Sequence, residues 1–141
     1  MGLGVGAYHL PLIDTMLFII FAFTNLLTIK ALKALIAQPR PGYPQALYSF
    51  EHYDGTESYG MPSGHASLSA FSVIYLYMYK GNIPAVTILA LVQTPITLLQ
   101  RYYTYAHSEM QLFMGLLVGT LMAYVSVMLA KRIRRRKEHK M

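Results

Sequence analysis

The chain has 141 residues, of which 55% are hydrophobic and 13% are charged, and it carries a formal net charge of +6. This share of charged residues is about half that of soluble proteins and indicates a membrane protein. The length predicts a single domain, and the absence of cysteine excludes disulfides and cysteine-ligated metal centres.

Four apolar segments follow one another, and we expect each to be a helix: residues 12–38, 63–79, 83–100 and 108–130. Their lengths approach the roughly 17 to 25 residues that cross a bilayer, although the second and third are short enough for one to be re-entrant. Asp14 and Thr15 are candidate caps for the first segment, which ends before Pro39. Pro95 predicts a kink in the third. The predicted fold is an all-α transmembrane bundle of about four spans.

A basic run follows the fourth segment, because seven of the twelve lysines and arginines lie in residues 131–141. Next to an apolar span, such a run is typical of a cytoplasmic tail beside lipid headgroups, so we expect no nucleic-acid partner. The chain therefore divides into a membrane domain, residues 1–130, and a basic tail, residues 131–141. Alternation across four spans then places the N-terminus and Lys80 on the cytoplasmic side, and segments 39–61 and 101–107 on the opposite side.

Segment 39–61 is the one long connection, and it contains three prolines and five aromatic residues. Two interpretations stay open for it. The aromatic residues can form a belt at the membrane surface, or the segment can be a lid over a site there, because loops of this length are often functional.

Two polar groups are expected to meet on the non-cytoplasmic face. Lys33 and Arg40 are seven residues apart, which places them on one side of a helix that persists to residue 38. Ser63, Gly64 and His65 stand at the start of the second segment, where unpaired backbone N–H groups favour an anion. The alternatives are that the two cations reach towards lipid headgroups and that Ser63 is only a capping residue.

A third polar group lies in "RYYTYAHSEMQ", residues 101–111, between the third and fourth segments. Arg101 ends one segment and His107 begins the next. Gln111 lies one turn below His107 on the same face if the helix starts near His107. Ionisable groups at this depth in a membrane protein are functional by default.

The chemistry of these three groups favours phosphate, because three fixed cations without nearby carboxylates suit a strongly anionic ligand. One histidine can attack phosphorus and form a covalent intermediate, while the other protonates the departing oxygen. The cations would stabilise the charge on the transferring group. We expect no metal or other cofactor. The alternative is a metal phosphatase using His52, Asp54 and Glu57, whose spacing matches no motif.

The same residues resemble the three signature motifs of the phosphatidic acid phosphatase type 2 superfamily. These motifs are K-x6-R-P in residues 33–41, P-S-G-H in residues 62–65 and R-x5-H in residues 101–107. The resemblance implies a membrane lipid phosphatase with metal-independent catalysis on a helical bundle related to that of vanadium haloperoxidases. It also implies residue roles: His107 is the nucleophile, His65 is the acid, and the phosphate is held by Lys33, Arg40, Ser63, Gly64 and Arg101.

Within the superfamily, the chain looks most like the dolichyl-diphosphate phosphatases, in "QPRP", "YGMPSGH" and the tyrosine-rich third motif that ends H-x3-Q. It departs from the branch at Gly64, where serine is usual. It departs from the general pattern at Gln100, in place of serine, and at Gln111, in place of aspartate. We expect Gln111 to accept a hydrogen bond from the far ring nitrogen of His107 and so to aim the attacking nitrogen, leaving the ring neutral at lower pH than an aspartate would.

The resemblance implies hydrolysis of a polyisoprenyl diphosphate to the monophosphate and inorganic phosphate through a phosphohistidine. Two alternatives stay open: a phosphatase for phosphatidate or another lipid monophosphate, and a weak or inactive member that binds lipid phosphate or a membrane partner. The membrane would be that of the endoplasmic reticulum in a eukaryotic or viral source and the plasma membrane in a prokaryotic one. Gly115 and Gly119 form a G-x3-G pattern, which permits a homo-oligomer or packing within one bundle.

Overall fold

The computed structural model describes residues 12–41 and 59–138, except for the side chains of 137 and 138. This part forms α1 (Leu12–Ile36), α2 (Gly64–Lys80), α3 (Pro84–Ile88), the π-helical turn η2 (Leu89–Gln93), α4 (Thr94–Tyr103) and α5 (Glu109–Glu138). Within the described ranges, the extended backbone amounts to one isolated bridge between Pro39 and Tyr59. The expectation of an all-helical fold is confirmed for this part of the chain.

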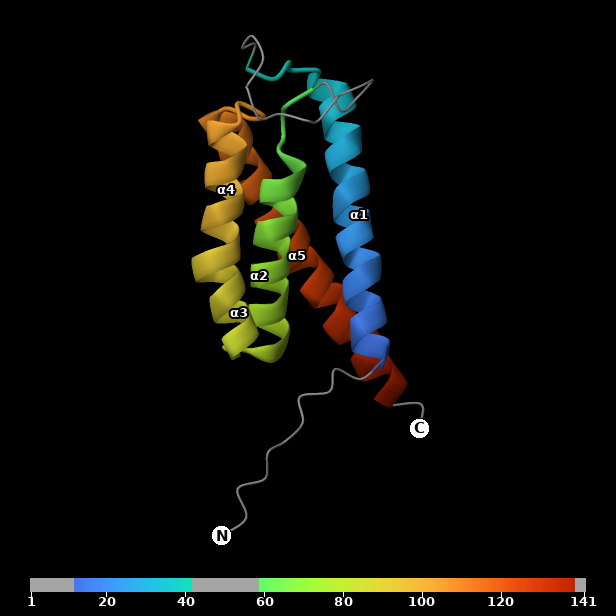
Figure 1. The fold of residues 1–141 in the computed structure, drawn as a ribbon. Coiled ribbons are helices and arrows are strands. Elements are labelled where there is room, and N and C mark those ends of the chain that lie inside the picture. Colours follow the sequence, from blue (N-terminus) through green and yellow to red (C-terminus); the bar gives the residue numbers. More distant parts are fainter. Residues whose placement is uncertain (1–11, 42–58, 139–141) are drawn as a thin grey trace.

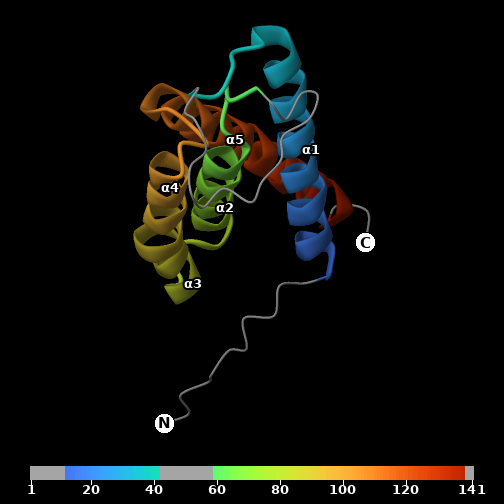
Figure 2. The same cartoon turned by 45° about the horizontal axis from the view of Figure 1, so that its top comes forward.

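The helices run up and down alternately (Figure 1). The end of α1, the start of α2, the end of α4 and the start of α5 lie together at what we call the upper end. The start of α1, the turn between α2 and α3 and the end of α5 lie at the lower end. In both views α2 lies between α1 and α4, and α5 crosses behind it (Figures 1 and 2). The helix ends and connections that carry the three motifs therefore meet at one end of the bundle.

The third pass is interrupted where the sequence predicts a kink. Its helical course continues to Tyr103, but residues 89–93 form a wider π-turn immediately before the start of α4. Pro95 has no amide hydrogen to donate to the preceding turn, which removes one helical hydrogen bond. The hydroxyl of Thr94 donates to the carbonyl of Leu89 at 2.8 Å, and so supplies a side-chain bond at the interruption.

Two of the described helices are long and apolar enough to cross a bilayer: Leu12–Ile36, with a mean hydropathy of 2.0, and the Glu109–Arg136 part of α5, with 2.1. The 17 residues of α2 and the divided third pass fall outside that criterion. Large apolar side chains on α1 and α5 are exposed in the isolated chain, among them Ile19, Phe23, Leu121 and Val125. Such apolar surface suits contact with lipid.

The core is built mainly where α5 crosses α2. Phe71 and Tyr75 of α2 pack against Ala123, Val127 and Ala130 of α5, and all five are buried. The rings of Phe71 and Tyr75 stack with centroids 5.4 Å apart. Small residues on α5 allow this close approach of the two helices.

Gly115 and Gly119 take part in the same crossing. A Cβ on Gly115 would lie 2.9 Å from the Cβ of Ala66 and would meet the carbonyl oxygen of Ser63, while one on Gly119 would meet the carbonyl oxygen of Ser67. The pattern therefore serves helix packing within one chain, which is the second of the two uses the sequence left open. A homo-oligomer through the same glycines would require this contact to open.

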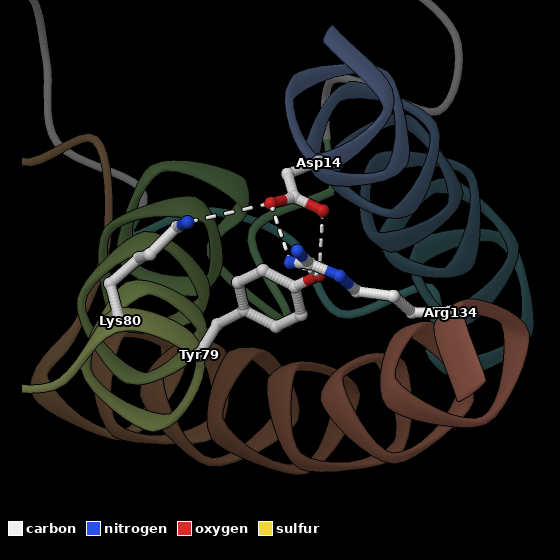
Figure 3. Close-up of polar contacts among 4 residues, drawn as sticks. All are labelled: Asp14, Tyr79, Lys80 and Arg134. Atoms are coloured by element: carbon white, nitrogen blue, oxygen red, sulfur yellow. Dashed lines mark hydrogen bonds and ion pairs between the residues drawn. The ribbon is translucent and has the colours of Figure 1, made fainter. Parts of the chain in front are cut away.

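Asp14 joins three helices at the lower end (Figure 3). It is the third residue of α1, not a cap before it, and its carboxylate is buried. It accepts a hydrogen bond from the hydroxyl of Tyr79 at 2.7 Å and pairs with Arg134 at 3.0 Å and Lys80 at 3.4 Å. Because these partners lie at the ends of α2 and α5, the cluster ties the lower end of the bundle together.

The basic run continues α5 past Ala130 to Glu138. Arg134 belongs to this run and binds Asp14, so at least one residue of the expected tail packs against the rest of the helical bundle. The remaining described cations of the run, Lys131, Arg132, Arg135 and Arg136, are exposed.

Candidate active site

A cavity of about 340 Å³ opens at the upper end between α1, α2 and the α4–α5 junction. Six of the residues that the sequence assigned to the site line it: Lys33, Arg40, Gly64, His65, Arg101 and His107. They come from three separate motifs and five segments of the chain: α1, the segment after it, the start of α2, the end of α4 and the α4–α5 junction. The predicted convergence of the motifs is therefore a feature of the structure.

Lys33 and Arg40 reach the cavity from different backbone conformations. Lys33 lies in the last turn of α1 and is buried. The helix then ends at Ile36 instead of persisting to residue 38, because Ala37 takes a left-handed conformation, with φ of 48°, and Pro39 disfavours helix in the residue before it. Arg40 follows in an extended segment, and its Nη1 donates to the carbonyl of Ala106 at 2.7 Å.

The second motif divides into a cap and a cavity wall. The hydroxyl of Ser63 accepts from the N–H of Ala66 at 3.4 Å, which makes Ser63 the N-cap of α2. Ser63 is fully buried and is not among the residues that line the cavity; its expected contact with phosphate stays a prediction. Gly64 and His65, in the first turn of α2, line the wall.

The third motif turns sharply between α4 and α5. Arg101 lies in the last turn of α4 and is buried. Tyr105 takes a left-handed conformation, with φ of 54°, which brings the N–H of His107 to 3.2 Å from the carbonyl of Arg101. Non-glycine residues in this conformation carry strain and are frequent at functional sites. His107 is 3% exposed and precedes the first residue of α5, Glu109.

The hydrogen bonds of His107 define its tautomer. Its Nδ1 lies 2.9 Å from the carbonyl oxygen of Gly60, and its Nε2 lies 3.2 Å from Nη1 of Arg40. A carbonyl only accepts and a guanidinium only donates. The proton therefore sits on Nδ1, and Nε2 presents a lone pair towards Arg40.

His65 is held in a similar way by an arginine. Its Nε2 lies 2.8 Å from Nη2 of Arg101, so this nitrogen also accepts a hydrogen bond. Each histidine of the cavity thus has one arginine donating to its Nε2. The two arginines thus place a fixed positive charge within hydrogen-bond distance of each ring nitrogen that could take part in chemistry.

The surroundings of His107 favour its neutral form. Burial is the largest cause that lowers its pKa, and the positive charges of Arg40, Lys33 and Arg101 act in the same direction, while the hydrogen bond to Gly60 opposes them. Together they lower the pKa from the usual 6.5 to about 3. At neutral pH the ring is therefore uncharged, with an available lone pair on Nε2. That is the state required of a nucleophile.

Gln111 does not hold the ring of His107, so this expectation is wrong. The cause is the start of α5: His107 lies before the helix, and the backbone carbonyl of Gly60 occupies the position beside Nδ1. Gln111 instead forms a reciprocal capping pair with Ser108. Its N–H donates to the hydroxyl of Ser108 at 3.3 Å, and its Oε1 accepts from the N–H of Ser108 at 3.2 Å.

The other half of the Gln111 amide binds the segment that follows α1. Its Nε2 donates to the carbonyl of Pro39 at 2.9 Å and to Oε1 of Gln38 at 3.0 Å. The carbonyl of Gln38 in turn accepts from the N–H of Gly60 at 2.8 Å. Gln111 therefore supports the two backbone segments that present Arg40 and the Gly60 carbonyl to the cavity.

Sequence reasoning missed Gly60 because a backbone carbonyl leaves no side-chain signature. The role of Gln111 had a readable signal in S-x-x-Q, residues 108–111, which is a capping-box pattern. That pattern places the helix start after residue 108, and it would have removed His107 from the helical face used to predict the contact.

Among residues 12–41 and 59–136, no three histidine, aspartate or glutamate side chains come together as a metal site. The alternative set, His52, Asp54 and Glu57, lies outside the described residues. The lid proposed for segment 39–61 also falls mainly outside them, in residues 42–58.

Comparison with known proteins gives one match. The model of the PAP2 superfamily matches residues 14–135, a range that contains all three motifs and the whole described cavity. No curated protein matches the chain, and no solved structure does.

Proposed function

The chain belongs to the PAP2 superfamily, and on this basis and that of the cavity we propose that it is an integral membrane phosphatase acting on a polyisoprenyl diphosphate of the dolichyl type. Members of the superfamily are generally phosphatases, and lipid phosphates are the substrates it suggests. One observation carries the proposal: Lys33, Arg40 and Arg101 surround two histidines in one cavity, with Nε2 of His107 unprotonated.

Substrate binding would begin with an exchange of partners. Arg40 and Arg101 donate to the Nε2 atoms of His107 and His65 at 3.2 Å and 2.8 Å. Phosphate oxygens are charged acceptors, which form stronger hydrogen bonds with a guanidinium than a neutral imidazole does. A terminal phosphate in the cavity therefore attracts both arginines and exposes the two ring nitrogens, while Lys33 adds a third positive charge.

The reaction then proceeds in two balanced steps. Nε2 of His107 forms a bond to the terminal phosphorus, and the bond between that phosphorus and the bridging oxygen breaks. Before this step, Nε2 of His65, which Arg101 has left for the phosphate, takes up a proton from solvent. The electron pair stays on the bridging oxygen, which accepts that proton from His65 as the lipid monophosphate leaves. Water then gives its proton to His65 and attacks the phosphohistidine, releasing inorganic phosphate and restoring the neutral ring.

The Gly60 carbonyl would stay hydrogen-bonded to His107 through both steps. It accepts from Nδ1–H of His107, which holds the ring with Nε2 towards the cavity. When the ring becomes positive in the phosphorylated state, the same carbonyl dipole stabilises that charge. A backbone carbonyl thus supplies the orienting role that the sequence assigned to the side chain of Gln111.

We also propose that the chain crosses the membrane about four times, with its cavity on the non-cytoplasmic face. The alternating passes support this arrangement (Figure 1). The lower end carries Lys80 and the basic run of α5, and positive residues favour the cytoplasmic side. The lipid tail of the substrate would then stay in the bilayer while its diphosphate enters the cavity. The membrane would be that of the endoplasmic reticulum in a eukaryotic or viral source, and the plasma membrane in a prokaryotic one.

A substrate panel tests the proposal. Purified protein in detergent would be assayed for phosphate release from a polyisoprenyl diphosphate, the matching monophosphate and phosphatidate, all with EDTA present. We expect the highest kcat/KM for the diphosphate, with the lipid monophosphate as product, and no activity in His107→Ala. The variant's fold would be checked by circular dichroism.

The other outcomes of the panel separate the alternatives. A higher kcat/KM for phosphatidate would assign the chain to the lipid monophosphate phosphatases. Folded protein with no activity on any of the three lipids would make it a phosphate-binding or partner-binding member. Loss of activity with EDTA would contradict the metal-independent mechanism.

A further inference from the structure

One face of α1 lines the cavity with two different kinds of side chain. Leu26, Ile29, Lys30 and Lys33 all border it, and their spacing of i, i+3, i+4 and i+7 places them on a single helical stripe. Lys33 belongs to the first motif, and phosphate binding already explains its position. Lys30 belongs to none of the three motifs, yet it adds a further positive charge to the same cavity wall.

The order of these residues along α1 matters. The helix runs towards the upper end (Figure 1). Along its axis, Lys30 therefore lies about 4.5 Å closer to the lower end than Lys33 does, and Leu26 lies about 6 Å further in the same direction. The opposite wall has the same order, because α2 runs downwards. Gly64 and His65 come first, and Leu68 follows one turn deeper. The cavity therefore changes from cationic at the upper end to apolar below, with Lys30 between the two parts.

A lipid diphosphate has the same sequence of chemical groups. Its terminal phosphate must reach Nε2 of His107, its hydrocarbon chain must stay with the apolar surface, and its lipid-linked phosphate lies between them. We propose that Lys30 binds this lipid-linked phosphate, while Lys33, Arg40 and Arg101 hold the terminal one. The inference rests on the proposed function and specifies how a diphosphate is selected.

From this position Lys30 would stabilise the leaving group during the reaction, in addition to binding the substrate. When the terminal phosphorus is transferred to His107, negative charge develops on the bridging oxygen and spreads over the departing lipid monophosphate. A lysine ammonium beside that phosphate stabilises the developing charge. With a lipid monophosphate as substrate, the departing group is an alcohol and has no phosphate for Lys30 to bind. Lys30 therefore favours diphosphates over monophosphates.

The competing interpretation is that Lys30, whose side chain is exposed, only extends towards lipid headgroups. In that case its loss would affect all lipid substrates alike or none. The two interpretations therefore differ in the ratio between substrates, and not merely in the size of the effect.

The test compares Lys30→Gln and Lys30→Arg with the wild type, using polyisoprenyl diphosphate and monophosphate of one chain length. Lys131→Gln, at an exposed lysine of α5 near the lower end, is the matched control. We expect Lys30→Gln to lower kcat/KM for the diphosphate by about 10- to 100-fold, the range for one charged hydrogen bond, while the value for the monophosphate changes by less than about threefold. Lys30→Arg and Lys131→Gln should each stay within about threefold of wild type on both substrates.

An equal loss on both lipids, or no loss on the diphosphate, would overturn the assignment. Titration of the folded protein with inorganic diphosphate and inorganic phosphate gives a second readout that needs no turnover. We expect Lys30→Gln to weaken diphosphate binding by about tenfold or more and phosphate binding by less than about threefold; equal effects would contradict the inference. If wild type hydrolysed no lipid phosphate, the proposed function would fail, and this titration would still decide the role of Lys30.

Discussion

Nδ1 of His107 lies 2.9 Å from the carbonyl oxygen of Gly60, a residue 47 positions earlier in the chain. This contact fixes the ring with its proton on Nδ1, and Arg40 approaches the other nitrogen as a donor. The candidate nucleophile is therefore oriented by backbone. No carboxylate is required to hold it in the tautomer that presents Nε2 to phosphorus.

The protonation of His107 is the first prediction. Since its pKa is lowered to about 3, we expect histidine NMR of the detergent-solubilised protein to show a neutral, Nδ1-protonated ring at all pH values between 4 and 7. The His107→Ala spectrum assigns the signal. A midpoint near 6.5, or a proton on Nε2, would contradict the arrangement described for the site.

The same pKa predicts the direction of a stability change. Between pH 6.5 and about 3 the unfolded chain binds a proton at His107 that the folded chain does not. The contribution of neutral His107 is therefore complete above pH 6.5 and is lost as the pH falls towards 3. Thermal unfolding should accordingly show a smaller loss of stability on acidification in His107→Ala than in wild type.

Gln111→Glu tests the supporting role of Gln111. The substitution keeps the shape and the bond from the N–H of Ser108 but removes the Nε2 donor to the carbonyl of Pro39. The side-chain amide of Gln38 can rotate so that its own NH2 group donates to the new carboxylate. The Pro39 carbonyl, in contrast, is left facing a carboxylate oxygen, which cannot donate a hydrogen bond to it. We expect a loss of about 1 to 3 kcal/mol in the free energy of unfolding, together with a lower kcat, because the segments around Gly60 and Arg40 lose their support.

Gln38→Ala is the control for that measurement, since Gln38 is exposed and loses only one side-chain hydrogen bond to Gln111. It should cost no more than about 1 kcal/mol. Unchanged stability in Gln111→Glu, combined with a changed tautomer of His107, would restore the idea that Gln111 orients the ring directly.

Gly119→Ala tests the close packing of α2 and α5. The added Cβ would meet the backbone carbonyl of Ser67, which cannot move without the helix. We expect a loss of about 1 to 3 kcal/mol in stability, typical of overpacking. Gly64→Ala is a matched change with room for a Cβ 3.6 Å from Ile29, and it should change stability by less than about 1 kcal/mol. A changed oligomeric state with unchanged unfolding in Gly119→Ala would instead place Gly119 between chains.

Asp14→Asn tests the cluster at the lower end. The asparagine can still accept from Tyr79 but loses its charge opposite Arg134 and Lys80. Breaking a fully buried pair costs several kcal/mol, and the partial exposure of both cations reduces this to about 1 to 3 kcal/mol. Lys80→Gln should cost less. Phosphatase activity per folded molecule should be retained in Asp14→Asn, and its selective loss would show coupling between the two ends of the bundle.

Much of the fold followed from hydrophobic patterning. Four apolar segments predicted the helical passes, and Pro95 predicted the interruption that the π-turn before it provides. The helix ends were less predictable. The end of α1 at Ile36 depends on the left-handed Ala37, and α5 extends beyond Ala130 through a basic sequence that reads as a tail. The contact between Asp14 and Arg134 joins residues near opposite ends of the chain, so no local sequence pattern predicts it.

The sequence predicted the parts of the candidate site that side chains form. It did not predict the parts that the backbone forms. The charged and histidine residues of the three motifs meet in the cavity because loops at one end of alternating helices converge. The orienting carbonyl of Gly60 has no side chain that the sequence could reveal, and Ser63 has the capping role that was the alternative to phosphate binding. Lys30 had a weak signal, since its spacing of three from Lys33 already placed it on nearly the same face.

The most direct test of the central claim is to trap the phosphorylated enzyme. Wild type and His107→Ala would be mixed with polyisoprenyl diphosphate labelled in its terminal phosphate, quenched within one turnover and analysed for protein-bound label. We predict acid-labile, base-stable label on His107 in the wild type, at up to one phosphate per site, and none in the variant. Rapid phosphate release by wild type without labelled protein, or equal labelling of folded His107→Ala, would contradict the assignment of His107 as the nucleophile.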